Sequence, residues 1–330
     1  MVNSLKPEFS FTSWYPEFRK DSLKATILPI PNETLAYLEQ DAFVLPVEAI
    51  RSVSENTQWS DGTTGTDDEY TDEPQPTFPE FSQKIQNTID EYGAVFIKSN
   101  WSSPSDAMWV APTKTLKCNT LEEVYLLLKS SDRIAKDFSN VKNYVDSERP
   151  LTSCLVLKQW RDINPCTEFR CFVIDRNLIA ISQRDISQYH SYNESEKFNI
   201  QTDIKSLFME RIKDKFPLST YSFDVIRLRK DRVKIVDFGP LDEAAAKGTL
   251  FTYQELQNQI NDAPEFRFIA EDIGIQPKAP TQFCIPQEIN DFFKSNENVA
   301  LLDAIQQEVE KQRKEHENAG DDLSENNTCP

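Results

Sequence analysis

The sequence has very few histidines and glycines, and this scarcity argues against several common kinds of active site. Only two of the 330 residues are histidine, which argues against a histidine-ligated zinc site and a histidine-based catalytic triad. The seven glycines form neither the GxGxxG turn of a dinucleotide-binding domain nor the loop that precedes Lys-Ser or Lys-Thr in a P-loop. We therefore exclude Rossmann and P-loop nucleotide sites.

Cysteine pairs and long apolar runs are also missing. The six cysteines include no CxxC pair, so structural zinc is not expected, and six are too few for a disulfide scaffold of this length. We expect them to be reduced and buried, and His190 to lie at the surface. The N-terminus is polar and no apolar run approaches the roughly 20 residues that span a bilayer. These features predict a cytoplasmic protein that does not bind membranes.

The strongly negative charge is confined to two segments. The chain carries 36 basic and 54 acidic residues, a net charge of −18. Residues 52–83 contain eight acidic and no basic residues, whereas residues 286–330 contain eleven acidic and four basic residues. The rest of the chain is thus close to neutral. The overall charge argues against nucleic acid as a partner. We expect a mobile acidic loop near residues 52–79, and an acidic helix and disordered tail over residues 291–330.

Two amphipathic helices are expected in the first half of the chain. The spacing of apolar residues predicts a helix over residues 80–92, ended by Gly93, followed by a buried strand AVFIKS. A second helix is predicted over residues 120–137, because Thr120 and Glu123 form a capping box. Further upstream, Trp14 and Tyr15 are either core residues or an exposed aromatic docking patch.

The pattern changes to short strands beyond residue 150. These runs are rich in β-branched and aromatic residues and are separated by turn-like residues: CLVLKQW, EFRCFVI, LIAISQR, YSFDVIRL and VKIVDFG. A helix near residues 200–216 interrupts them. The order of elements predicts an α+β fold with a mostly antiparallel sheet.

A pair of aspartates in the last two of these strands is the strongest chemical signal. If Lys230 and Asp231 form the turn of a hairpin, Asp224 lies directly opposite Asp237. Two facing carboxylates need a cation or a proton, and Mg²⁺ accepts one or two carboxylates together with phosphate oxygens. The alternatives are a register shifted by one residue, or pairing of each aspartate with an arginine such as Arg170 or Arg184. The string VKIVDFG also resembles a kinase DFG strand, but the glycine-rich loop and the HRD motif are absent.

Several cationic residues are candidates for binding phosphate near these aspartates. Lys98 ends an apolar strand and either points into a cleft or is solvated at a sheet edge. Arg170 and Arg184 lie on neighbouring strand segments and suit bidentate phosphate recognition, or form salt bridges with Glu168 and Asp185. The tripeptide Lys158-Gln159-Trp160 ends a strand, either as a surface for an adenine edge or as an ordinary strand exit.

These segments together resemble the cell-division-cycle protein 123 family. The resemblance covers residues 11 to about 256, and it includes the specific strings FTSWYPEFRK, FIKSNWSSPSDAMWV, LVLKQWRDINPCTEFRCFV and LIAISQRDISQYH. It implies an ATP-grasp-like fold in which two lobes with mostly antiparallel sheets enclose an ATP cleft. The expected N-terminal lobe spans residues 1–150, and the expected C-terminal lobe spans residues 151–290.

The resemblance also implies a function and a partner. A member of this family is expected to be a cytosolic, monomeric chaperone that binds the γ subunit of eukaryotic translation initiation factor 2 and promotes assembly of the heterotrimer. ATP and Mg²⁺ are the expected cofactors. The alternative is an ATP-grasp ligase that activates a carboxylate as an acyl phosphate, and sequence alone does not establish turnover.

Site residues carry over by position from the family pattern. The residues that would cover the phosphates are Lys98, Asn100, Trp101, Ser102 and Ser103. The residues that would form the adenine hinge are Lys158, Gln159 and Trp160. Glu168, Arg170 and Arg184 complete the nucleotide-binding set, and Asp224 and Asp237 would hold Mg²⁺. The chain departs from the pattern at Gly239, where the family tends to have an asparagine ligand, and Asp242 is a candidate substitute.

Overall fold

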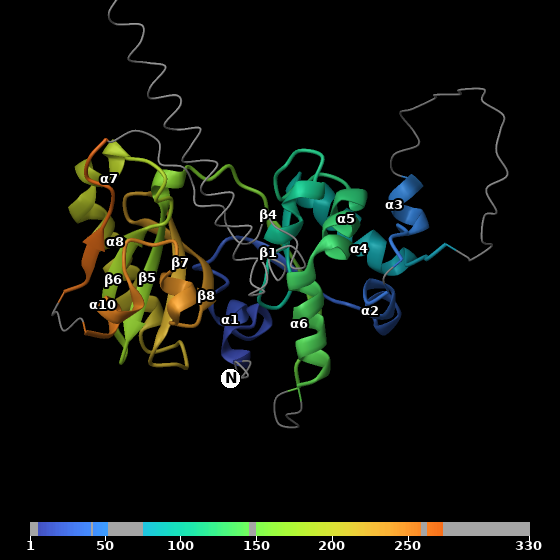
Figure 1. Cartoon of the computed structure of the whole chain (residues 1–330), viewed down its shortest axis with the longest axis horizontal. Helices are drawn as coiled ribbons and strands as arrows, with labels where there is room; N and C mark the ends of the chain where they lie inside the picture. The colour runs from blue at the N-terminus through green and yellow to red at the C-terminus, as the bar shows by residue number, and fades with distance from the viewer. Residues whose placement is uncertain (1–5, 41, 52–74, 145–149, 259–262, 273–330) are drawn as a thin grey trace, which may run out of the picture. The chain divides into compact units, whose positions relative to one another are not determined.

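The structure is a computed structural model, and it describes residues 6–40, 42–51, 75–144, 150–258 and 263–272 (Figure 1). All of these residues belong to one compact unit, residues 1–279. They form a four-stranded sheet of order β1-β4-β2-β3 and a five-stranded sheet of order β8-β7-β5-β6-β9. Most of the expected acidic loop (52–74), the whole expected tail (291–330), and Cys284, His316 and Cys329 lie outside the described residues.

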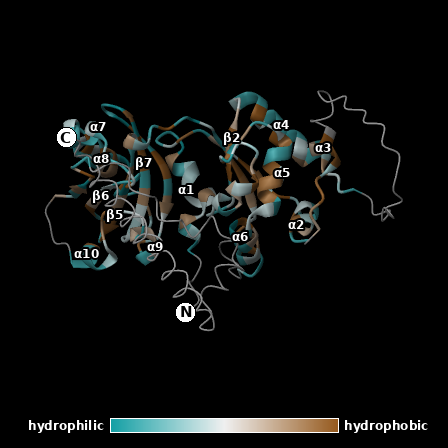
Figure 2. Cartoon of the chain, turned by 45° about the horizontal axis from the view of Figure 1, so that its top comes forward, coloured by the Kyte–Doolittle hydropathy of each residue, from teal (hydrophilic) through white to brown (hydrophobic). Residues whose placement is uncertain are grey.

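The four-stranded sheet is antiparallel throughout. Helices from the first half of the chain, other than the one nearest the N-terminus, share a core cluster with its strands. Its strands are β1 (Ala25–Pro29), β4 (Cys154–Gln159), β2 (Val95–Lys98) and β3 (Lys117–Cys118). The helices in this part of the chain are α2 (Asn32–Leu38), α3 (Val47–Arg51), α4 (Pro79–Tyr92), α5 (Leu121–Ser130) and α6 (Asp132–Lys142), with a 3₁₀ turn at Ser105–Val110. In Figure 2 the apolar colour is prominent on β2 and α5, whose side chains contribute to one core cluster.

The predicted helix over residues 80–92 is confirmed as α4. Its apolar side chains at four-residue intervals, Phe81, Ile85 and Ile89, are all buried against the sheet. Gly93 follows with a φ of 79°, a left-handed conformation that favours glycine and ends the helix. The local sequence is therefore sufficient to determine where α4 stops.

The predicted helix over residues 120–137 is two helices, and the single-helix prediction was wrong. The capping box between Thr120 and Glu123 is present at the start of α5. The helix then breaks at Ser131, whose hydroxyl accepts a hydrogen bond from the Ile134 amide and begins α6. The same hydroxyl donates to the Asp106 carboxylate at 2.7 Å. This contact with a distant residue favours the break.

The five-stranded sheet confirms the strands predicted beyond residue 150. Its strands are β5 (Glu168–Ile174), β6 (Asn177–Gln183), β7 (Tyr221–Arg229), β8 (Arg232–Gly239) and β9 (Glu265–Arg267). Only β9 pairs in parallel, with β6. The helices here are α7 (Ser191–Ser195), α8 (Lys197–Leu207), a π-helical turn (Phe208–Ile212), α9 (Glu243–Ala246) and α10 (Tyr253–Asn258), with a 3₁₀ turn at Pro165–Thr167.

The N-terminal segment packs into the core of the five-stranded sheet. After a 3₁₀ turn at Pro7–Phe9, helix α1 (Phe11–Phe18) buries its aromatic residues in the same cluster as the strands of this sheet. Trp14 and Tyr15 are 3% and 4% exposed, so the core interpretation is correct and the docking patch is not. Further along, Ser22 forms a parallel bridge with Ile235 of β8.

The predicted α+β class with mostly antiparallel sheets is confirmed by these pairings. The lobe boundary at residue 150 stays a prediction, although β4 lies beyond it and pairs with the first sheet. The four cysteines in the described ranges are buried and form no disulfide bond, as expected. Within the described ranges, no helix has the length and apolar character needed to cross a bilayer.

Candidate functional site

The two aspartates face each other across the β7–β8 hairpin, as predicted. Lys230 and Asp231 form the turn, and Asp224 pairs with Asp237. Two irregularities lie between the turn and this pair: Leu228 is an extra residue on β7, and Val236 is an extra residue on β8. Because one extra residue lies on each strand, the two shifts cancel and the aspartates remain opposite.

Asp224 is paired with an arginine of its own sheet. Arg170, its cross-strand partner on β5, donates from Nε to Asp224 Oδ1 and from Nη2 to Oδ2, both at 2.7 Å. The arginine alternative considered for the aspartates is therefore present for Asp224. The Asp224 and Arg170 side chains are 14% and 17% exposed, respectively, so both are largely buried. Burial by itself raises the pKa of Asp224, but the Arg170 guanidinium outweighs it and holds the pKa below its usual value.

Asp237 is paired with a lysine from the other sheet. The Lys98 ammonium donates to Asp237 Oδ2, and the lysine side chain is only 2% exposed. The alternative of a solvated edge residue is wrong, because β2 is an interior strand between β4 and β3. Asp237 itself is 29% exposed, so water reaches one side of its carboxylate. The site thus has one carboxylate enclosed by protein and one partly open to solvent.

Lys158 adds a second buried lysine beside the same strand. Its Nζ donates to the Val236 carbonyl at 2.6 Å, so the side chain reaches β8. Burial lowers the pKa of Lys158 to about 8, although the nearby Asp237 carboxylate opposes this shift. The neighbouring amides of Gln159 and Trp160 donate to the carbonyls of Lys24 and Ala94. The adenine-hinge role of this tripeptide stays a prediction.

A small cavity of about 70 Å³ lies beside the aspartate pair. Its lining residues are Arg170, Ser222, Phe223, Asp224, Asp237, Phe238 and Gly239. A Cβ atom at Gly239 would lie 3.5 Å from Ser222 Oγ, an ordinary contact. Asp242 instead caps α9, because its Oδ1 accepts from the Ala245 amide at 2.7 Å. Within the described ranges, no group of three or more His, Cys, Asp or Glu side chains is placed to hold a metal ion. The metal-binding roles of Asp224, Asp237 and Asp242 stay predictions.

The loop predicted to cover phosphates is anchored by buried polar contacts. Asn100 is fully buried, and its amide bonds to Ser10, Thr152 and Cys154. The Ser102 amide donates to the Asp137 carboxylate at 2.8 Å. The contacts of Asn100 join the loop to the N-terminal segment and to the start of β4.

The other two residues of this loop, Trp101 and Ser103, are both partly buried. The Trp101 indole nitrogen is buried and has no hydrogen-bond partner among the described residues. Within the described part of the chain, this N–H group is therefore an unsatisfied donor in the residue that directly follows the buried Asn100. The phosphate-covering roles of Lys98, Asn100, Trp101, Ser102 and Ser103 stay predictions.

Glu168 and Arg184 lie at adjoining strand ends, and the Arg184 amide donates to the Glu168 carbonyl at 3.1 Å. Burial, together with the Asp224 carboxylate, raises the pKa of Glu168.

The His190 Nε2 atom lies 3.4 Å from Asp185 Oδ2, and the His190 side chain is only 13% exposed. The prediction that His190 is a surface residue was therefore wrong. The loop around Asp185 encloses the imidazole more than its polar sequence indicates.

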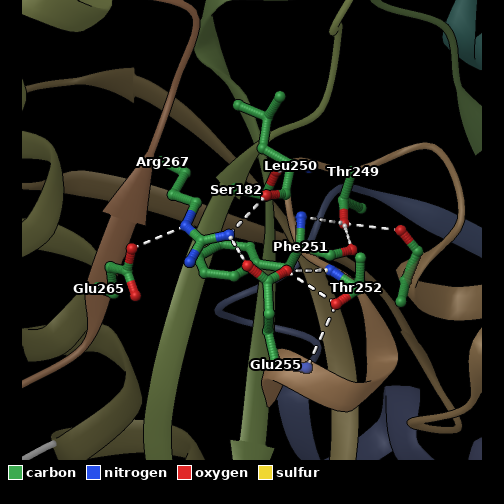
Figure 3. A network of polar contacts seen from close by, with 9 residues as sticks. Ser182, Thr249, Leu250, Phe251, Thr252, Glu255, Glu265 and Arg267 are labelled. Atoms are coloured by element: carbon green, nitrogen blue, oxygen red, sulfur yellow. Dashed lines mark hydrogen bonds and ion pairs between the residues drawn. The ribbon is translucent and has the colours of Figure 1, made fainter. Parts of the chain in front are cut away.

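The segment after the hairpin is tied back to the sheet by a polar network (Figure 3). Arg267 of β9 donates to the Leu250 carbonyl at 3.0 Å and to Glu255 at 2.9 Å, while Ser182 of β6 accepts from the Leu250 amide. This segment includes α9, whose Ala245 carbonyl accepts from Arg170 Nη1 at 3.0 Å. Arg170 is therefore held by a carboxylate and a carbonyl. The sequence did not predict a backbone carbonyl as a partner of Arg170, because a backbone group leaves no side-chain pattern.

The sequence profile described as D123 matches residues 14–293. The chain belongs to the D123 family. A relative named cell division cycle protein 123 and a solved structure of Cdc123 also match this chain, so the predicted resemblance to that family is confirmed.

Relatives from an animal and from fungi illustrate the similarity. One, named translation initiation factor eIF2 assembly protein in Xenopus tropicalis, is 34% identical over 89% of this chain and 93% of its own. Another, cell division cycle protein 123 of Yarrowia lipolytica, is 39% identical over 69% of this chain and 62% of its own. The solved structure of Cdc123 from Schizosaccharomyces pombe is 33% identical, covers 82% of this chain and all of its own, and superposes with a TM-score of 0.64.

Proposed function

We propose that the chain binds ATP together with Mg²⁺ at the Asp224–Asp237 pair, and that the bound nucleotide supports assembly of translation initiation factor 2 through its γ subunit. The observation that carries the ATP part is the meeting of four charged groups from two sheets: Asp224 with Arg170, and Asp237 with Lys98. The assembly part rests on relatives named for eIF2 assembly that are about one-third identical over most of the chain.

The residues present fit a magnesium ion. Carboxylate oxygens are the ligands Mg²⁺ prefers, and it typically takes only one or two of them because phosphates and water supply the rest. Asp224 and Asp237 are the two carboxylates, and they line the same small cavity. Bound there, the ion would neutralise charge on the phosphates. Asp242 is not needed in this set, since its carboxylate caps α9.

The cations of the site fit phosphate groups. Arg170 presents a planar fork suited to phosphate, and the buried Lys98 adds a compact charge. In the structure each of these two cations is neutralised by an aspartate. Phosphate oxygens would take over the cations while the carboxylates turn to the metal. Because MgATP is itself a net anion, this exchange adds negative charge, and the buried Lys158 is the further cation that would offset part of it.

Asp237→Asn tests the ATP proposal most directly. The change keeps the size of the side chain and removes the carboxylate charge that would hold Mg²⁺, so we expect MgATP affinity to fall at least tenfold. Isothermal titration with ATP, with and without Mg²⁺, measures it. Asp231→Asn is the matched control, because the same change is made in the same hairpin at its exposed turn. Absence of binding by the wild type at millimolar nucleotide would refute the ATP proposal.

The partner proposal needs a separate experiment. Purified chain is mixed with the isolated γ subunit of initiation factor 2, with and without MgATP, and the complex is followed by size-exclusion chromatography. We expect a one-to-one complex with a single copy of this chain, weakened in Asp237→Asn if the nucleotide organises the binding surface. No complex at micromolar concentrations in either condition would overturn the partner assignment, whatever the nucleotide result.

A further inference from the structure

Phe11 is an uncharged residue of helix α1, and it lies next to the two buried lysines of the site. It is fully buried, and its backbone amide donates to the Asn100 carbonyl at 2.8 Å. Helix α1 therefore begins against the segment that follows Lys98. This bond fixes the backbone of Phe11 close to the end of strand β2.

Two lysines lie over the Phe11 ring. The Nζ atoms of Lys98 and Lys158 are 5.4 Å and 5.0 Å from the ring centroid. The lysines come from adjacent strands: Lys98 pairs with Val156 and Lys158 with Phe96, so they are diagonal neighbours on one face of the sheet. Both ammonium groups are within the range at which a ring attracts a cation.

The ring cannot easily leave this position. Tyr15 stacks on Phe11 with centroids 4.6 Å apart, and Trp14 packs edge-on at the same separation. All three rings are buried in the core cluster that joins the five-stranded sheet to Cys154 and Val156 of β4. Phe11 is therefore a fixed apolar wall, with one sheet's core behind it and the other sheet's lysines in front.

The lysines need such a wall because they repel each other. Both are nearly inaccessible to water, and the polar groups that accept from them are the Asp237 carboxylate and the Val236 carbonyl. If phosphate replaces the carboxylate, each ammonium group must stay close to its present position to contact it. An aromatic face attracts a cation without competing for the anion, because it accepts no proton and carries no net charge.

We propose that Phe11 is a positioning residue for the phosphate-binding cations: its ring holds the Lys98 and Lys158 ammonium groups beside Asp237 and Val236 before nucleotide arrives. This inference rests on the proposed binding of MgATP. Pre-organised lysines lose less conformational freedom on binding, so the ring contributes to affinity without touching the ligand.

A fluorinated series at position 11 tests the role of the ring face. Phenylalanine with one, two or three ring fluorines has almost the same shape but a progressively weaker attraction for cations. We expect MgATP affinity to fall stepwise, by about tenfold overall, and Phe11→Leu to match the trifluoro variant. The same series at Phe9, a buried ring that stacks on Phe216, is the control and should leave affinity unchanged. Equal affinities across the position-11 series would overturn the proposal.

A measurement without nucleotide separates this inference from the proposed function. NMR of the chain carrying ¹³Cε-labelled lysine measures the lysine Hε resonances. Ring currents from Phe11 should shift those of Lys98 and Lys158 upfield. Phe11→Leu should return them to ordinary shifts, while Phe9→Leu should not. Shifted resonances in a wild type that binds no MgATP would refute the ATP proposal, and with it the role of Phe11 in nucleotide binding, but would leave the contact of Phe11 with the two lysines standing. Unshifted resonances in the wild type would refute the Phe11 contact, even if MgATP binds.

Discussion

The two sheets contribute charge to the site in opposite ways. The five-stranded sheet carries both carboxylates and neutralises one of them internally, through the two-point contact of Arg170 with Asp224. The four-stranded sheet carries two buried lysines, Lys98 and Lys158, and both reach for groups of β8. The five-stranded sheet therefore neutralises Asp224 by itself, whereas Asp237 and the two lysines find their partners only where the two sheets meet.

Removing the arginine is expected to have the largest effect. Arg170→Met leaves the Asp224 carboxylate buried without a cation, and loss of one partner from a buried pair costs about 3–5 kcal/mol. Urea denaturation measures the unfolding free energy. Lys98→Met is the matched variant: since Asp237 is partly exposed, we expect a loss of only about 1 kcal/mol. Similar losses for the two variants would break the comparison between the sheets.

The second lysine should reveal itself in the pH dependence of stability. The folded pKa of Lys158, about 8, is below its ordinary value of 10.5, so the folded chain binds fewer protons between these values than the unfolded chain. Stability from this group therefore rises from pH 8 to pH 10.5, by about 1.4 kcal/mol per pH unit at most. Lys158→Met removes this contribution. The difference in unfolding free energy between wild type and variant is measured at pH 7, 8, 9 and 10; a constant difference would contradict the prediction.

The smallest effect concerns the missing asparagine. A side chain at Gly239 meets only Ser222 Oγ at an ordinary distance, and the backbone there is not left-handed, so Gly239→Asn should change the unfolding free energy by less than about 1 kcal/mol. The added carbamoyl oxygen lies at the wall of the cavity and should tighten Mg²⁺ binding in the presence of ATP a few-fold. Titration of Mg²⁺ into the ATP complex measures this.

An ATPase assay on the same variant addresses the ligase alternative. Turnover that appears only with asparagine at position 239 would indicate that the natural chain uses ATP as a bound ligand. Unchanged Mg²⁺ affinity in Gly239→Asn would mean that position 239 does not face the ion.

Local sequence was a good guide to most elements. Gly93 ends α4, Thr120 and Glu123 cap α5, and Lys230-Asp231 turn the hairpin, because each of these signals acts within a few residues. The opposition of Asp224 and Asp237 was also predicted correctly, although the simple pairing rule omitted two irregularities that cancel. The break at Ser131 was missed, since its hydroxyl bonds to Asp106 from another element.

The partners of the charged residues were harder to predict. Lys98 was left between a cleft and a solvated edge, because a strand sequence does not reveal its neighbours in a sheet. Lys158 was expected at an adenine edge, and its contact with Val236 depends on a carbonyl that has no sequence signature. His190 followed polar residues, yet the fold brings Asp185 against it and encloses both.

The sequence by itself determined the hairpin, the facing aspartates and the family, since these depend on turns, alternation and ordered motifs along the chain. The tertiary structure alone decided which cation neutralises which carboxylate and placed Phe11 under the two lysines. Arg170 and Asp224 are 54 residues apart, and Lys98 and Asp237 are 139 apart. No local periodicity extends over such separations: the pairing of β5 with β7 brings Arg170 to Asp224, and the packing of the two sheets brings Lys98 to Asp237.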